Sequence, residues 1–178
     1  RFNSAEVPAK MGTFPQYDHP HTRKRYAEMA SFVGIEGKSD EEKVEKLMQV
    51  TDLVMLDIKH IDPEKHKDLT QQPNTNILKF AEYLNDKHID MWIRHVVVPG
   101  ITDDDRYLFK LGYYIGQFTN LKALDVLPYH TMGEKKYESL GIPYKLKGVP
   151  AMDTKTLLVK KAVILDGIRK RRAELQQG

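Results

Sequence analysis

Hydrophobic and polar positions alternate between two periods from about residue 50 onward. Residues 52–59, 89–98 and 121–127 are apolar runs typical of buried strands, and the last two stop at Pro99 and Pro128. Between and after these runs, apolar residues recur at helical spacing, which predicts helices at about 75–87, from about 103 to 115, and after an N-cap at Asp153. This order predicts right-handed crossovers and a parallel sheet. Three strands cannot close a barrel, so they form a small open sheet or part of a larger one.

The first fifty residues have a different pattern. Residues 1–18 contain Pro8, Gly12 and Pro15 without a usable period, which predicts an extended loop. A helical period begins at His21 and is followed by Gly34, where we expect that helix to end. A capping box at residues 39–42 then predicts a second short amphipathic helix. We therefore expect a two-helix segment ahead of the α/β part.

The composition excludes several classes of function. The 178 residues suffice for one domain with a core, and a net charge of +3 is too small to indicate nucleic-acid binding. The basic run at residues 169–172 is expected to be a solvated helix end. No segment is apolar enough for a membrane span. The chain has no cysteine, so it contains no disulfide, thiol nucleophile or thiolate ligand for zinc or an iron–sulfur cluster.

Polar residues gather where the predicted strands end. Asp57 and Lys59 are two residues apart, so they share one face, and Arg94 and His130 belong to the next strand ends. Ligands bind at this end of parallel sheets, and this set suits an anionic or ribose-bearing molecule. The alternative is a hydrated strand end. Lys59 as a Schiff-base lysine is disfavoured by the neighbouring carboxylate. His130 is either a general base or a structural residue, and Arg94 requires a partner, either substrate or a nearby aspartate.

Three motifs resemble one enzyme family. They are VTDLVMLDIK at residues 50–59, WIRHVVVPG at 92–100 and LPYH at 127–130, with GIPY at 141–144 and Gly148-Val149 as further matches. In order and spacing they resemble the pyruvate formate-lyase activating enzymes, which are radical S-adenosylmethionine (radical SAM) enzymes. The resemblance implies that residues 49–178 are the C-terminal half of a partial (β/α)6 barrel. It also implies a cytoplasmic protein of anaerobic glucose metabolism.

The resemblance further implies a set of site residues and cofactors. Asp57 and Lys59 would lie near the ribose of S-adenosylmethionine, Val96 would contact its adenosyl group, and His130 would lie on the ligand's far side. Arg94 would position ligand or substrate peptide, and Met55 with Asp57 would border a cation site. In the family a Cys-x3-Cys-x2-Cys loop holds a [4Fe–4S] cluster that cleaves S-adenosylmethionine. The resulting radical abstracts hydrogen from a glycine loop of pyruvate formate-lyase, the implied partner.

Residues 1–48 resemble a different family. The strings RFN at 1–3, MGTFPQYDHP at 11–20 and RYAE at 25–28, with the stretch at 34–46, are similar to the iron-dependent alcohol dehydrogenase part of bifunctional aldehyde–alcohol dehydrogenases. We interpret the chain as a fusion of two fragments from fermentative enzymes.

Three functions stay open at this point. The chain is an activase half-barrel, a catalytically inactive fragment with residual binding of S-adenosylmethionine or peptide, or an alcohol dehydrogenase remnant that lacks its metal and nucleotide segments. Half a barrel would also expose a sheet edge, through which the chain could self-associate.

Overall fold

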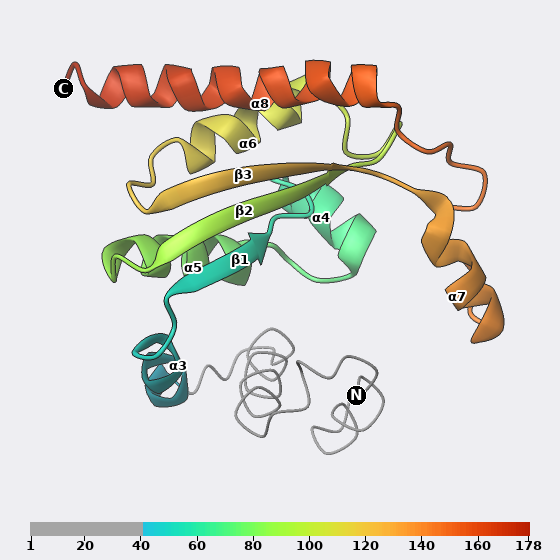
Figure 1. The fold of residues 1–178 in the computed structure, drawn as a ribbon, viewed down its shortest axis with the longest axis horizontal. Coiled ribbons are helices and arrows are strands. Elements are labelled where there is room, and N and C mark those ends of the chain that lie inside the picture. The colour runs from blue at the N-terminus through green and yellow to red at the C-terminus, as the bar shows by residue number, and fades with distance from the viewer. Residues whose placement is uncertain (1–40) are drawn as a thin grey trace. The chain divides into compact units, whose positions relative to one another are not determined.

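The computed structural model describes residues 41–178, and the chain divides into two compact units, residues 1–52 and 53–178 (Figure 1). In the first unit the described element is helix α3, Glu41–Met48. It confirms the short amphipathic helix predicted after residue 39. The predicted helix between His21 and Gly34 and the predicted loop at 1–18 lie outside the described residues.

The second unit is built on a parallel three-stranded sheet. Its strands are β1 (Leu53–Asp57), β2 (Asp90–Val97) and β3 (Leu121–Pro128), in the spatial order β1-β2-β3. The register places Asp57 opposite Arg94 and Arg94 opposite Asp125. The predicted fold class, α/β with three parallel strands and helices, is therefore confirmed.

Helices connect the strands and cover one side of the sheet. Helix α5 (Thr75–Asp86) follows β1 and packs against β2, while α6 (Asp105–Ile115) joins β2 to β3. The long helix α8 (Thr154–Leu175) runs along α6 and also contacts β3 (Figure 1). Asp104 and Asp153 accept hydrogen bonds from backbone N–H groups at the starts of α6 and α8, so the N-cap predicted at Asp153 is confirmed.

Two glycines bring α6 and α8 into backbone contact. A Cβ added to Gly112 would lie 1.9 Å from the carbonyl oxygen of Ile164, and one added to Gly167 would lie 2.3 Å from that of Phe109. Any larger residue at either position would push the helices apart. Glycine is therefore required here by close approach of two backbones rather than by a turn.

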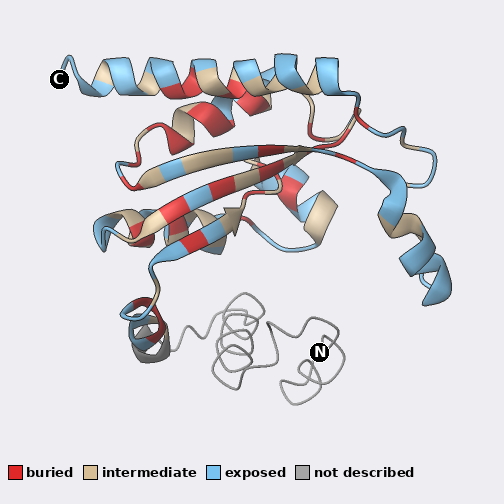
Figure 2. Cartoon of the chain, in the orientation of Figure 1, coloured by how far each residue is buried: buried red, intermediate tan, exposed pale blue. Residues whose placement is uncertain are grey.

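The core lies between the sheet and the helices. Met91, Ile93 and Val97 from β2 are fully buried, as are Ile58 just after β1 and Leu84 and Leu111 from the helices. Buried residues run along the strands and along the helix surfaces that face them (Figure 2). Among the described residues, no helix is both long and apolar enough to span a lipid bilayer.

Three short helices differ from the prediction. No helix was predicted in the polar stretch between the first strand and the helix at about 75–87, but α4 occupies Pro63–Thr70, and η2 (Thr131–Gly133) and α7 (Glu134–Ser139) follow β3. Helix α4 starts with Asp62 as N-cap and Pro63 in its first turn, a signal that was present in the sequence. Its single buried residue, His66, gives almost no hydrophobic period, which is why the pattern did not reveal a helix.

Candidate functional site

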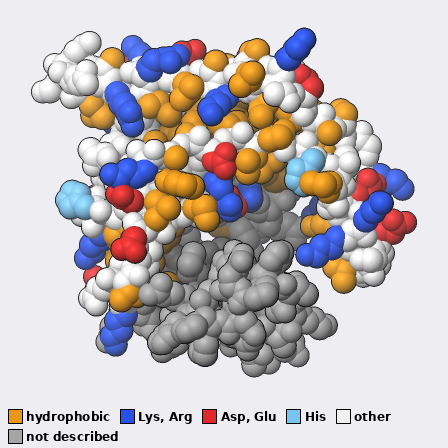
Figure 3. Space-filling view, viewed as in Figure 1, with side chains coloured by type: hydrophobic (Ala, Val, Ile, Leu, Met, Phe, Trp, Pro, Cys, Tyr) orange, Lys and Arg blue, Asp and Glu red, His pale blue; other side chains and the backbone are white. Residues whose placement is uncertain are grey.

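The carboxylate of Asp57 joins two basic side chains at the end of β1. Arg94 donates from Nε to Oδ1 at 2.9 Å and from Nη2 to Oδ2 at 3.2 Å, and Lys59 Nζ donates to Oδ2 at 3.0 Å. The side chains remain 33%, 35% and 42% exposed for Asp57, Arg94 and Lys59, respectively. The face of the sheet in view carries acidic and basic side chains among hydrophobic ones (Figure 3). The structure thus brings three predicted site residues into one cluster.

The register of the sheet explains this pairing. Asp57 and Arg94 are opposite each other on neighbouring strands, so a bidentate contact forms without distortion of either backbone. The predicted strand at 52–59 ends at Asp57, and Lys59 lies beyond it, although the N–H of Ile58 still donates to the Arg94 carbonyl at 3.1 Å. The partner that Arg94 requires is therefore the neighbouring aspartate.

Electrostatics keep the Asp57 carboxyl ionised. Burial alone would raise its pKa, but the hydrogen bonds and charges of Lys59 and Arg94 outweigh burial, so the pKa of Asp57 lies below its ordinary value. The cluster carries two positive charges and one negative charge. Lys59 is ion-paired and open to water rather than desolvated, which does not favour a Schiff-base role.

Val96 and Met55 lie on the same face as the charged cluster, because Val96 is two residues from Arg94 in β2 and Met55 is two residues from Asp57 in β1. Val96 is half-buried, and its carbonyl accepts a hydrogen bond from Thr102 Oγ1 at 2.8 Å, which fixes the end of β2. Met55 is 52% exposed. The predicted contact surface for an adenosyl group is therefore accessible.

His130 follows β3 and is exposed at the N-cap of η2. The segment before it is anchored: Tyr129 donates its N–H to the Val97 carbonyl at 3.1 Å, and its hydroxyl lies 2.8 Å from that of Tyr144. This hydrogen bond, more than burial, raises the pKa of Tyr144 to about 12. His130 thus belongs to the same end of the sheet as the cluster, but it is not a member of the Asp57 hydrogen-bond network.

The predicted cation site at Met55 and Asp57 has little free ligand capacity. Three hydrogen bonds from Lys59 and Arg94 already occupy the Asp57 oxygens. In the part of the chain that the structure describes, no group of three or more acidic, histidine or cysteine side chains is placed to hold a metal ion. The cation site stays a prediction.

Two residues on the open face of the sheet were not predicted as site residues from the sequence. Trp92 is 39% exposed beside Met55, and Asp125 is exposed opposite Arg94. The two-residue period from Arg94 could have revealed Trp92, because both must face the same side. Asp125 depends on the register between β2 and β3, which contains an irregularity at residues 91–92 that no sequence pattern indicates.

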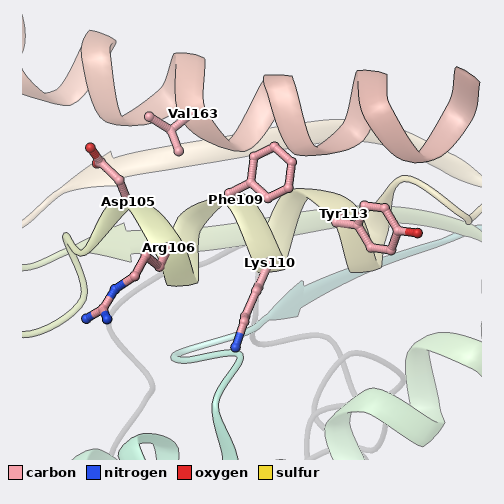
Figure 4. A pocket seen from close by; sticks show the side chains of 6 residues that line it. All are labelled: Asp105, Arg106, Phe109, Lys110, Tyr113 and Val163. Carbon is pink, nitrogen blue, oxygen red and sulfur yellow. The ribbon is translucent and has the colours of Figure 1, made fainter.

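A separate groove of about 720 Å³ lies between α6 and α8. Phe109 and Val163 lie between the two helices, while Arg106 and Lys110 point away from α8 (Figure 4). None of the predicted site residues lines this groove. Its open, apolar lining offers no convergent polar groups, so the cluster at the strand ends remains the better candidate site.

Comparisons with known proteins show which proteins the chain is similar to. Residues 24–111 match the radical SAM superfamily. The chain is 56% identical over 108 residues to the pyruvate formate-lyase-activating enzyme of Streptococcus mutans, covering 61% of this chain and 41% of that protein. It is 47% identical over 123 residues to that of Listeria monocytogenes, covering 69% of this chain and 50% of that protein. The chain thus spans half or less of the length of these relatives.

A solved structure shares the fold. It is a domain of the pyruvate-formate lyase-activating enzyme from Bacteroides vulgatus, with a TM-score of 0.57, 17% identity, and coverage of 71% of this chain and 70% of that one. The superfamily match begins within the segment for which we predicted an alcohol dehydrogenase resemblance, and none of these comparisons supports that resemblance. Over 61–69% of its length the chain is thus similar in sequence to pyruvate formate-lyase-activating enzymes, and residues 24–111 match the radical SAM superfamily.

Proposed function

We propose that this chain carries the S-adenosylmethionine-binding half of a pyruvate formate-lyase-activating enzyme, and that by itself it binds this ligand without cleaving it. The observation that carries the proposal is the Asp57–Lys59–Arg94 cluster. It lies at the carboxyl ends of two parallel strands, where α/β folds bind ligands, and on the open side of the sheet.

The chemistry of the cluster fits a nucleoside with a charged tail. Asp57 uses three of its acceptor positions internally, while Lys59 and Arg94 keep further N–H groups for ribose hydroxyls or a carboxylate. Val96 offers an apolar surface to the adenosyl group, and His130 approaches from the third strand end. Arg94 orients the ligand through Asp57 and, in this proposal, contacts the substrate peptide.

The iron–sulfur cluster of the family does not fit this chain. A [4Fe–4S] cluster of this kind is held by cysteine thiolates, and the sequence contains no cysteine. No step of the radical reaction is therefore assigned to the residues of this chain. Their roles are limited to binding and orienting the nucleoside.

The proposed macromolecular partner is the glycyl-radical loop of pyruvate formate-lyase. Leu53, Met55 and Trp92 give the open face exposed apolar surface beside the charged cluster, which suits an extended peptide. Self-association through a sheet edge stays a prediction. It would appear as a concentration-dependent mass in sedimentation experiments.

Calorimetric titration with S-adenosylhomocysteine, which has the same nucleoside and cannot be cleaved, tests the binding half of the proposal. We expect binding to the wild-type chain and a dissociation constant raised at least about tenfold in Asp57→Asn, because Lys59 and Arg94 lose a charged partner. Lys122→Ala is the matched control, since Lys122 pairs with Asp90 at the opposite end of the sheet. Absence of binding to the wild-type chain would refute the proposal.

Anaerobic iron–sulfur reconstitution followed by assay for 5′-deoxyadenosine tests the proposal that the chain does not cleave S-adenosylmethionine. We expect no cluster absorption and no product from this chain, because it has no thiolate ligands. Formation of 5′-deoxyadenosine in proportion to reconstituted iron would show that the chain is catalytic by itself.

A further inference from the structure

Two buried histidines lie directly behind the charged cluster. His95 sits between Arg94 and Val96 in β2, and His60 follows Lys59. They are 3% and 2% exposed, and His95, which alternates with Arg94, points to the helix-covered side of the sheet. In both rings Nε2 is buried without a hydrogen-bond partner among the described residues. Such buried polar groups call for a physical explanation.

The hydrogen bond of His95 defines its tautomer. Its Nδ1 lies 2.7 Å from the carbonyl oxygen of Ile58. A carbonyl only accepts, so the proton is on Nδ1. Ile58 is the residue between Asp57 and Lys59, and its N–H donates to the Arg94 carbonyl. His95 therefore completes the attachment of this peptide segment to β2 after the regular strand has ended.

The hydrogen bond of His60 requires the opposite tautomer. The N–H of Asp62 donates to Nδ1 of His60 at 3.0 Å, so this nitrogen carries a lone pair and the proton is on Nε2. Asp62 is also the N-cap of α4, where its carboxylate accepts from the N–H of Lys65. The ring packs edge-on against Tyr107 with centroids 4.8 Å apart. His60 thus fixes the loop that leads from Lys59 into α4.

Burial favours the neutral forms of the two rings. Burial lowers the pKa of His60, and the nearby His95 and Lys65 lower it further. Asp62 raises the pKa, but by less. Burial also lowers the pKa of His95. The backbone of Ile58 and of Thr102 raises it, while the charge of Lys59 lowers it and that of Asp57 raises it. The hydrogen bond of His60 excludes a proton on Nδ1, and that of His95 requires one there; burial favours the neutral form of both rings near neutral pH.

We propose that His60 and His95 are positioning residues for the nucleoside site: held in opposite tautomers, they clamp residues 58–62 from the covered side and so fix the direction in which Asp57 and Lys59 reach toward the ligand. The affinity part of this inference rests on the proposed function, whereas the tautomer part does not. Neither ring touches the ligand. They act through the peptide backbone on both sides of Lys59.

Nitrogen-15 spectra of histidine-labelled full-length chain test the tautomers directly. We expect a proton on Nδ1 of His95 and on Nε2 of His60 at neutral pH, each assigned from the loss of its signals in a single variant. The opposite tautomer in either ring, or a doubly protonated His60 at neutral pH, would overturn the inference.

Affinity for S-adenosylhomocysteine separates positioning from mere stability. We expect His95→Leu to raise the dissociation constant about tenfold, and His95→Asn, which keeps a donor near the Nδ1 position, to restore most of the affinity. The matched control is His66→Leu. His66 is 1% exposed and bonds the Gln72 carbonyl at 2.8 Å, within and just after α4, so its loss should lower stability without changing affinity.

The outcomes are distinguishable. Equal affinity in wild type, His95→Leu and His66→Leu would refute positioning while leaving the proposed function intact. Failure of the wild-type chain to bind would refute the proposed function, and the tautomers alone would then decide the inference.

Discussion

The two faces of the sheet are made by the same strands and have opposite properties. On the covered face, Ile93 and Val97 are fully buried beneath helices, whereas on the other face Met55 and Trp92 are 52% and 39% exposed. Successive residues of β2 point to opposite faces of the sheet, so buried and accessible residues alternate along the strand. The covered face stabilises the unit, and the open face holds the charged cluster. A strand in this molecule is therefore a core element and a site element at once.

The largest expected contrast is in stability. Ile93→Ala should lower the free energy of unfolding by about 2–5 kcal/mol, because it leaves a cavity under the helices. Met55→Ala on the open face should change it by about 0.5 kcal/mol or less. Urea denaturation of both variants measures the difference. Equal losses would mean that the open face is covered in solution.

A substitution in the helices that cover the sheet should lower stability without altering the strands. Gly112→Ala should lower the free energy of unfolding by about 1–3 kcal/mol, because the new methyl group would overlap the Ile164 carbonyl. Gly133→Ala is the control, since a Cβ there meets nothing within 4 Å and its φ of −71° suits alanine. Thermal unfolding monitored by circular dichroism compares the two. A Gly112→Ala variant as stable as wild type would contradict the close helix contact.

Acid should weaken the covered face first. The pKa values of His60 and His95 are lowered in the folded chain, so their contribution to stability is complete above about pH 6.5 and declines as pH falls below it. The unfolded chain binds those protons more readily. Denaturant midpoints of wild type and His95→Asn between pH 7.5 and 5 measure this, using about half-unit steps. Identical slopes in the two proteins would contradict a buried neutral His95.

The smallest effect on stability is expected on the open face. Asp57→Asn should cost about 1 kcal/mol or less at pH 7, because its partners are one-third or more exposed and solvent screens the pair. The loss should fade as pH falls below the ordinary carboxyl pKa of 3.8 and through the lower pKa of the folded chain, where Lys59 and Arg94 keep Asp57 ionised. Denaturation at pH 7 and at about pH 3 tests this. A loss of several kcal/mol at pH 7 would place the cluster in the core.

Much of the fold followed from local signals in the sequence. The N-cap at Asp153, the helical spacing of apolar residues and the apolar runs of the strands located the long elements within a few residues. Helix α4 was missed because a lone buried His66 leaves no period to detect. At the site, Asp57 and Lys59 were placed on one face by spacing alone. Their partnership with Arg94 depends on strand register, which is a tertiary property.

The roles of the histidines could not be predicted for the same reason. A sequence shows that His95 alternates with Arg94, but it does not show which carbonyl lies opposite its ring. Only the end of β1 beside β2 brings the Ile58 carbonyl within 2.7 Å. Because such a contact depends on how two strands pack, it produces no motif in the sequence.

We propose that the open face binds the nucleoside and the covered face does not. Titration of the ¹⁵N-labelled chain with S-adenosylhomocysteine, followed by amide chemical shifts, distinguishes the two faces. We expect changes at residues 55–60, 92–98 and 127–130, reduced in Asp57→Asn, and none in the α6–α8 groove around Phe109. Changes confined to that groove, or no changes at saturating ligand, would contradict it.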